Sequence, residues 1–246
     1  MPSVIINSMR MLNTNHRIGK YSLMEWLIIG VFVYFFVVLE RMMLGRIMVL
    51  LISVVIHEVA HGMAALWCGD QTAKRQGRLT LNPIHHIDPL GSIFLPLMLV
   101  VSGSPFLFGW AKPVPVNTQQ LNHPINDMLK VAIAGPLSNI TLAVLCSVII
   151  KVLIVVSPTT IRQFPWVIEL LSYGVIINIV LAVFNMIPIP PMDGSRVLYR
   201  YLPDTGRSWL DKMEPYGLLI IILLSFFGFF SVILRVFSMP LIHLLL

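Results

Sequence analysis

Long apolar runs separated by short polar breaks constrain this chain more than any other feature. Runs of nearly membrane-spanning length or longer lie at about 21–39, 44–68, 129–156, 166–187 and 216–238. A bilayer core about 30 Å thick needs roughly 20 apolar residues as a helix. Only 11% of the residues are charged, against roughly 25% in soluble domains. The pattern predicts an all-α polytopic membrane protein surrounded by lipid.

A sixth apolar stretch, at about 89–109, differs because prolines and glycines interrupt it. Irregular backbone at membrane depth is tolerated only where protein or a water-filled cavity satisfies its polar groups. We therefore expect a re-entrant or membrane-embedded loop here, and about five to six transmembrane helices in the whole chain.

The distribution of basic residues predicts an orientation. If 89–109 re-enters, twelve lysines and arginines fall on one side of the membrane and five on the other. An excess of these residues marks the cytoplasmic side, so we expect a cytoplasmic N-terminus. Because the basic residues flank the spans and form no aromatic-interleaved stripe, the net charge of +6 does not indicate nucleic-acid binding.

No polar break is long enough for a soluble domain, so we expect one membrane-embedded domain over 1–246. It would comprise an N-terminal span at about 21–39, a core at about 44–200 and a C-terminal span at about 216–238. The first run is interpreted as a retained anchor and not as a cleaved signal peptide. The sequence leaves the oligomeric state open.

The motif His57-Glu58-Val59-Ala60-His61 lies in the second apolar run. Four residues of α-helix advance about 400°, so His57 and His61 share one face and can reach one metal ion. Glu58 beside them can accept a proton from the water that the metal activates. Ionisable groups are expensive inside an apolar helix, which favours a metal site over packed core histidines.

Catalytic zinc usually takes three protein ligands, so a third is required. The residue types and positions leave five candidates open: Asp193, His85, His86, Cys68 and Asp88. Asp193 follows Pro188, Pro190 and Pro191, which deny the backbone helical hydrogen bonds and predict an extended path back towards the metal. A solvated aspartate in a helix-terminating turn is the alternative.

Taken together, these motifs resemble the site-2 protease family of intramembrane metalloproteases, in particular small bacterial members without PDZ or CBS domains. The resemblance covers roughly residues 44–200. The matching segments are His57–Gly62, Gly77–Pro83, His86–Gly91, Gly109–Asn117, Ala134–Asn139 and Phe184–Gly194.

The resemblance implies one Zn2+ ion held by His57, His61 and Asp193, with Glu58 as the general base. It places Asn185 near the substrate and the developing oxyanion, where an amide donor fits; an interhelical hydrogen bond is the alternative. The implied activity is hydrolysis of transmembrane protein substrates within or next to the bilayer, as in regulated intramembrane proteolysis.

Two other functions stay open at this point: a metal-ion transporter, and a pseudoprotease that binds membrane proteins without cutting them. Among the remaining polar residues, His86 is interpreted as a loop residue or as a partner of a ligand, and Lys112 as an anchor or a groove residue. Gly135, Ser138 and Asn139 are interpreted as allowing close helix packing.

Reporter fusions test the predicted orientation. A fusion near Ser102 should report a cytoplasmic position, because a re-entrant segment returns to its own side, and a fusion near Thr160 should report an extracytoplasmic one. An extracytoplasmic Ser102 would contradict the re-entrant interpretation.

Overall fold

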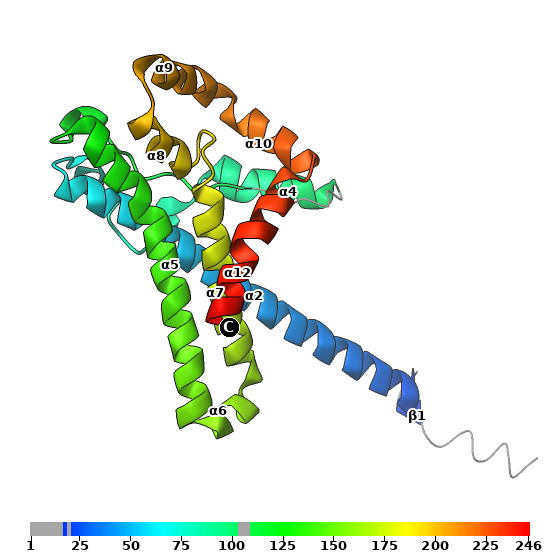
Figure 1. Cartoon of the computed structure of the whole chain (residues 1–246). Coiled ribbons are helices and arrows are strands. Elements are labelled where there is room, and N and C mark those ends of the chain that lie inside the picture. Colours follow the sequence, from blue (N-terminus) through cyan, green and yellow to red (C-terminus); the bar gives the residue numbers. More distant parts are fainter. Residues whose placement is uncertain (1–16, 19–20, 103–108) are drawn as a thin grey trace, which may run out of the picture. The chain divides into compact units, whose positions relative to one another are not determined.

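The computed structural model describes residues 17–18, 21–102 and 109–246, and it divides into two compact units, Met1–Gly45 and Arg46–Leu246 (Figure 1). In the first unit, two short antiparallel strands, β1 (Arg17–Ile18) and β2 (Tyr21–Ser22), precede the start of helix α2. The second unit contains the rest of the described chain, including all the candidate site residues.

Helix α2 runs without interruption over Leu23–Trp67. The apolar runs at about 21–39 and 44–68, predicted as separate spans, both lie within this helix. The polar break between them consists of Glu40, Arg41, Met42 and Met43, which are good helix formers, and charge alone does not end a helix. Its portion Met42–Trp67 is long and apolar enough to cross a membrane.

Helices α5 (Pro124–Val156) and α7 (Pro165–Asn185) pack against each other and are joined by the short helix α6 (Pro158–Gln163) (Figure 1). Each begins with a proline, which fits the first turn of a helix because its missing N–H has no partner there. Both are long and apolar enough to span a bilayer. With α2, they provide the framework of the site.

Between α2 and α5, the chain forms short elements: α3 (Thr72–Arg75), 3-10 turns over Pro83–His86 and Thr118–Gln120, a π-helical turn over Pro89–Phe94 and α4 (Leu95–Val101). Trp110 N donates to Gly91 O at 3.1 Å, and Ser92 Oγ donates to Trp110 O at 2.8 Å. Gly91 and Ser92 therefore lie beside Trp110, as the two ends of a re-entrant segment must.

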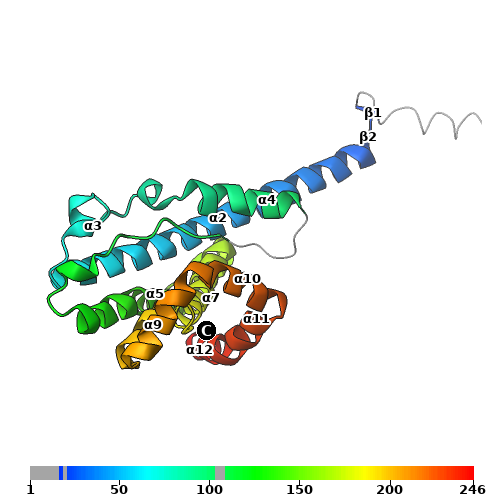
Figure 2. The same ribbon diagram turned by 90° about the horizontal axis from the view of Figure 1, so that it is seen from above.

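The C-terminal region continues with α8 (Asp193–Tyr201), α9 (Asp204–Met213), a 3-10 turn over Glu214–Tyr216, α10 (Gly217–Phe226), α11 (Phe229–Ile233), a π-helical turn over Leu234–Ser238 and α12 (Met239–Leu245). The apolar run predicted as a C-terminal span at about 216–238 contains a bend. The helices on either side of Phe227 and Gly228 bend by 73° (Figure 2), because Gly228 has a φ of 73°, a left-handed conformation that ends helices.

The prediction of an all-α polytopic membrane protein is confirmed. Within the described residues, three helices are long and apolar enough to cross a membrane, or four if the bent C-terminal pair counts as one span. In α2 this count begins at Met42, so it does not test the span predicted at about 21–39.

Candidate metal centre

His57 and His61 lie one turn apart on α2 and are both buried, with 7% and 8% of their surface exposed. Their Nε2 atoms are 3.0 Å apart, so both rings point their distal nitrogens at the same place. The sequence spacing of four residues produces this arrangement because positions i and i+4 are neighbours on one helix face.

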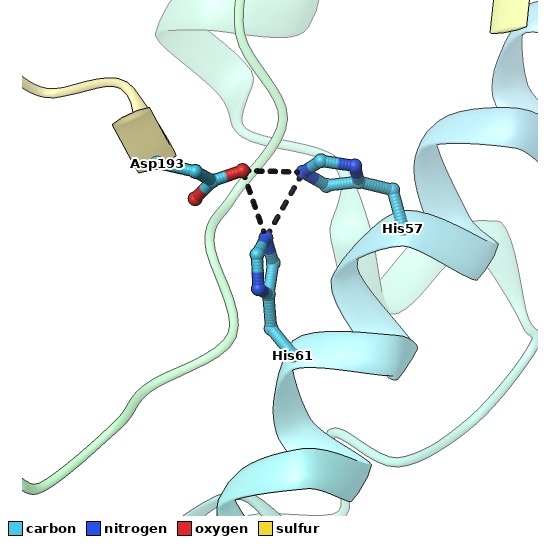
Figure 3. A group of neighbouring side chains, drawn as sticks. All are labelled: His57, His61 and Asp193. Atoms are coloured by element: carbon cyan, nitrogen blue, oxygen red, sulfur yellow. Dashed lines mark hydrogen bonds and ion pairs between the residues drawn. The ribbon is translucent and has the colours of Figure 1, made fainter. Parts of the chain in front are cut away.

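Asp193 approaches the same place as the first residue of α8. Its Oδ2 lies 3.3 Å from His57 Nε2 and 3.3 Å from His61 Nε2, and Figure 3 shows the carboxylate facing both rings. The turn that delivers it is tight, since a Cβ on Gly194 would lie 2.2 Å from Met186 O. Only glycine fits at this approach of α8 to the end of α7.

The proline-rich segment before Asp193 differs from its predicted extended path. Residues 187–192 form bends and turns, with Met192 N donating to Ile189 O at 3.0 Å. Proline excludes the helix, but its fixed φ suits a turn as well as an extended strand. The carboxylate therefore reaches the histidines by a compact reversal of the chain.

The hydrogen bonds on the other side of each ring determine what the Nε2 atoms can do. His61 Nδ1 lies 2.7 Å from Val131 O, and His57 Nδ1 lies 2.6 Å from Asn139 Oδ1. Carbonyl oxygens only accept, so each Nδ1 is the donor. In the neutral rings both Nε2 atoms then carry lone pairs, and three acceptor atoms face one another.

Three facing acceptors repel one another unless a cation lies between them. In tetrahedral zinc sites, nitrogen and oxygen ligands lie about 2.0–2.1 Å from the ion, which places them about 3.3 Å from one another. The observed separations of 3.0, 3.3 and 3.3 Å fit this geometry. Among the described residues, His57, His61 and Asp193 are the one cluster of three potential ligands.

The Oδ2 atom of Asp193 also suits a metal ligand. It is buried and has no hydrogen-bond partner within the described part of the chain. A buried carboxylate oxygen without a donor requires a positive charge beside it, and the ionised carboxylate is the form that coordinates a cation.

Glu58 points to the loop over 109–117. Its Oε2 accepts a hydrogen bond from Val114 N at 2.7 Å, and Val114 lies between two prolines that have no N–H. Arg78, 7% exposed, donates from Nη2 to Lys112 O at 2.9 Å and to Pro113 O at 3.3 Å. Arg78 thus holds the loop whose amide orients the carboxylate of Glu58.

The other sequence candidates lie outside this cluster. Asn185 Nδ2 donates to Leu181 O of its own helix at 2.9 Å. His86 Nε2 bonds Thr80 O at 2.9 Å, as the interpretation of His86 as a loop residue expects, and Asp88 Oδ1 accepts from Leu90 N and Gly91 N. Neither these residues nor His85 and Cys68 join the three-residue cluster among the described residues.

Two residues contribute to the centre in ways that the sequence did not reveal. Asn139 and Gly135, both interpreted as helix-packing residues, lie against the histidines: Asn139 accepts from His57, and a Cβ on Gly135 would lie 2.3 Å from His61 Nε2. The spacing of Gly135 and Asn139, four residues apart on one helix face, was the available signal, but it does not distinguish a neighbouring helix from a neighbouring imidazole.

Comparison with known proteins identifies the family. The sequence profile of peptidase family M50 matches residues 45–228. The chain belongs to peptidase family M50. This is the site-2 protease family, and the match contains the histidines, Glu58 and Asp193.

Several relatives have names that describe zinc metalloproteases. YwhC of Bacillus subtilis is 36% identical over 179 residues, which cover 72% of this chain and 78% of that protein. Rip2 of Mycolicibacterium smegmatis is 30% identical over 175 residues, 71% of this chain and 63% of that protein. No solved structure matches the chain. The M50 chain is a zinc metalloprotease of the site-2 type, and its cofactor is Zn2+.

Replacing Gly135 with alanine should disrupt the centre. The added methyl group would meet His61 Nε2 at 2.3 Å and His57 Cε1 at 2.6 Å, so at least one ring must move. We expect zinc affinity, measured by competition with a chelator, to fall about 10- to 100-fold, as when partners of metal ligands are lost.

Gly206→Ala is the matched control. A Cβ there lies no closer than 3.2 Å to Leu202, a residue of the loop before α9, so zinc affinity should not change. Equal zinc affinity in the two variants would contradict the assigned role of Gly135.

Proposed function

We propose that this M50 protein hydrolyses peptide bonds of transmembrane protein substrates within or next to the bilayer, as in regulated intramembrane proteolysis. One observation carries the proposal: His57 Nε2 and His61 Nε2, on a helix apolar enough to span a membrane, converge with Asp193 Oδ2 of α8. A hydrolytic centre on such a helix suits membrane segments as substrates.

In this proposal His57, His61 and Asp193 hold one zinc ion. Zinc supplies Lewis-acid activation of water and of the peptide carbonyl. Both imidazoles bind through Nε2, since their Nδ1 atoms donate to Asn139 and Val131. Such hydrogen bonds fix the orientation of a ligand ring.

Glu58 takes the role of general base. Val114 N occupies Oε2, so Oε1 accepts the proton from the attacking water and later returns it to the leaving amine. The hydrogen bond from Val114 limits rotation of the carboxylate, and a positioned base contributes roughly 10²- to 10⁴-fold to the rate.

Asn185 is proposed to donate its amide to the developing oxyanion. Its Nδ2 bonds Leu181 O at 2.9 Å in the present arrangement, so the side chain must release this contact when substrate binds. An amide donor at an oxyanion contributes a few kcal/mol, about 3–4, which exceeds the usual value of one intrahelical hydrogen bond, about 1 kcal/mol.

A substrate must locally unwind to expose its carbonyl, and an extended segment of the enzyme can then pair with it as an added strand. Segment 188–192 folds into turns, whereas 109–117 has neither helix nor turn and carries Val114 beside Glu58. The second segment therefore suits strand pairing better.

An apolar cavity of about 190 Å³ lies along α2 in the turns before His57, on a different helix face from the histidines, and it suits an apolar substrate. It is lined by Met48, Leu51, Ile52, Val55, Ile56, Leu81 and Pro83. We propose that it receives side chains of the substrate segment, while the bacterial cell membrane surrounds the protein. The cytoplasmic N-terminus remains a prediction.

Replacement of Glu58 by glutamine separates this function from its alternatives. The amide cannot accept the proton, so cleavage of a transmembrane substrate should fall by at least about 10²-fold, while the zinc content should stay close to that of the unmodified protein. Membrane proteomics should then show single-span proteins that accumulate uncut.

The control is Glu169→Gln, which changes an exposed carboxylate on α7. It should cleave at the original rate. Undiminished cleavage by the Glu58→Gln protein would contradict the proposed mechanism. If no uncut single-span proteins accumulate in either variant strain, the result would favour a pseudoprotease that binds membrane proteins without cutting them.

A further inference from the structure

Three polar side chains are buried where α2, α5 and α7 meet. Ser53 on α2, Asn139 on α5 and Asn178 on α7 have at most 2% of their surface exposed. All three helices are apolar enough to span a membrane. Buried amides in such helices require hydrogen-bond partners, and the direction of each hydrogen bond can be followed from one side chain to the next.

The direction is fixed first at Asn178. Its Nδ2 donates to Gly174 O at 2.9 Å and to Ser53 Oγ at 2.9 Å, and the single hydroxyl proton of Ser53 is used for Val49 O at 2.8 Å. A flipped amide would place its oxygen against a backbone carbonyl that only accepts. Asn178 Oδ1 must therefore face Asn139.

Asn139 transmits this direction to His57. Its Nδ2 donates to Asn178 Oδ1 at 2.8 Å, with a longer contact of 3.4 Å to Ser53 O, and its Oδ1 lies 2.6 Å from His57 Nδ1. Since Oδ1 only accepts, Nδ1 carries the proton. The lone pair of His57 then lies on Nε2, which faces Asp193 Oδ2.

We propose that Asn178 is a positioning residue that sets the tautomer of His57 through Asn139, although Asn178 contacts none of the three ligands. The inference rests on the proposed metal centre. Without an oxygen at position 178, Asn139 Nδ2 loses the shorter of its two hydrogen bonds. The amide of Asn139 can then turn its Nδ2 towards the ring of His57. His57 would then carry its proton on Nε2, which prevents ligation.

A carboxylate at position 139 gives the decisive comparison. Both oxygens of an aspartate accept, so Asn139→Asp would bond His57 Nδ1 whichever way it is turned, and it would need no direction from Asn178. A residue with only a packing role would not behave in this way, because a second buried substitution beside the first should add damage.

The experiment measures the zinc dissociation constant of the full chain in detergent by chelator competition, with thermal unfolding of the metal-free protein as a measure of folding. Asn178→Leu should weaken zinc binding by about 10-fold or more. The double variant Asn178→Leu/Asn139→Asp should regain most of that loss. If the leucine variant does not fold, Asn178→Ser replaces it, since serine can bond Gly174 O but cannot reach Asn139.

Ser147→Ala is the matched control because Ser147 is also buried on α5 but bonds Leu245 O; it should lower thermal stability and leave zinc affinity unchanged. Unchanged zinc affinity in the Asn178 variant, or a double variant that binds zinc no better than the single one, would overturn the inference alone. An unmodified protein that binds no zinc would overturn the metal centre itself.

Discussion

Three electron-pair donors, two imidazole nitrogens and one carboxylate oxygen, lie within 3.3 Å of one another in a region from which water is largely excluded. Such an arrangement is unfavourable without a positive charge between the three atoms, and the cost rises as the surroundings become less polar. The other features of the second unit are understood most simply as the means of holding these atoms in place around a divalent cation.

The absence of a side chain at two glycines makes the convergence possible. Gly135 lets α5 pack directly against the imidazole rings, and Gly194 lets the start of α8 approach the end of α7. Hydrogen bonds from the rings to Val131 O and Asn139 Oδ1 then decide which nitrogen faces the centre. Helix packing and ligand chemistry therefore depend on the same residues, which is why the centre needs few side chains of its own.

Much of this could be predicted from the sequence because it follows from local rules. The spacing of His57 and His61 places them on one helix face, and apolar run length identifies α5 and α7 as spans. The continuity of α2 was not predicted, because Glu40 and Arg41 were taken as a break between two helices. The bend at Gly228 was not predicted either, because a single glycine inside a hydrophobic run was not taken as a break. The path of Pro188–Met192 was missed because proline excludes a helix without choosing between a strand and a turn.

The contacts of Asn139, Asn178 and Val114 could not be predicted, because each joins residues more than 35 positions apart in the sequence. Asn178 in an apolar run was visible as an unusual residue, but its partner depends on the rotation of α7 about its axis. For the same reason the resemblance to the site-2 proteases supplied the third ligand, whereas the residue types alone left five candidates.

X-ray absorption at the zinc edge, recorded on the purified full chain, tests the central claim most directly. The account predicts one zinc ion per chain with only nitrogen and oxygen ligands at about 2.0–2.1 Å, including two imidazoles. A sulfur ligand at about 2.3 Å, as Cys68 would provide, or a protein that retains no zinc, would contradict it.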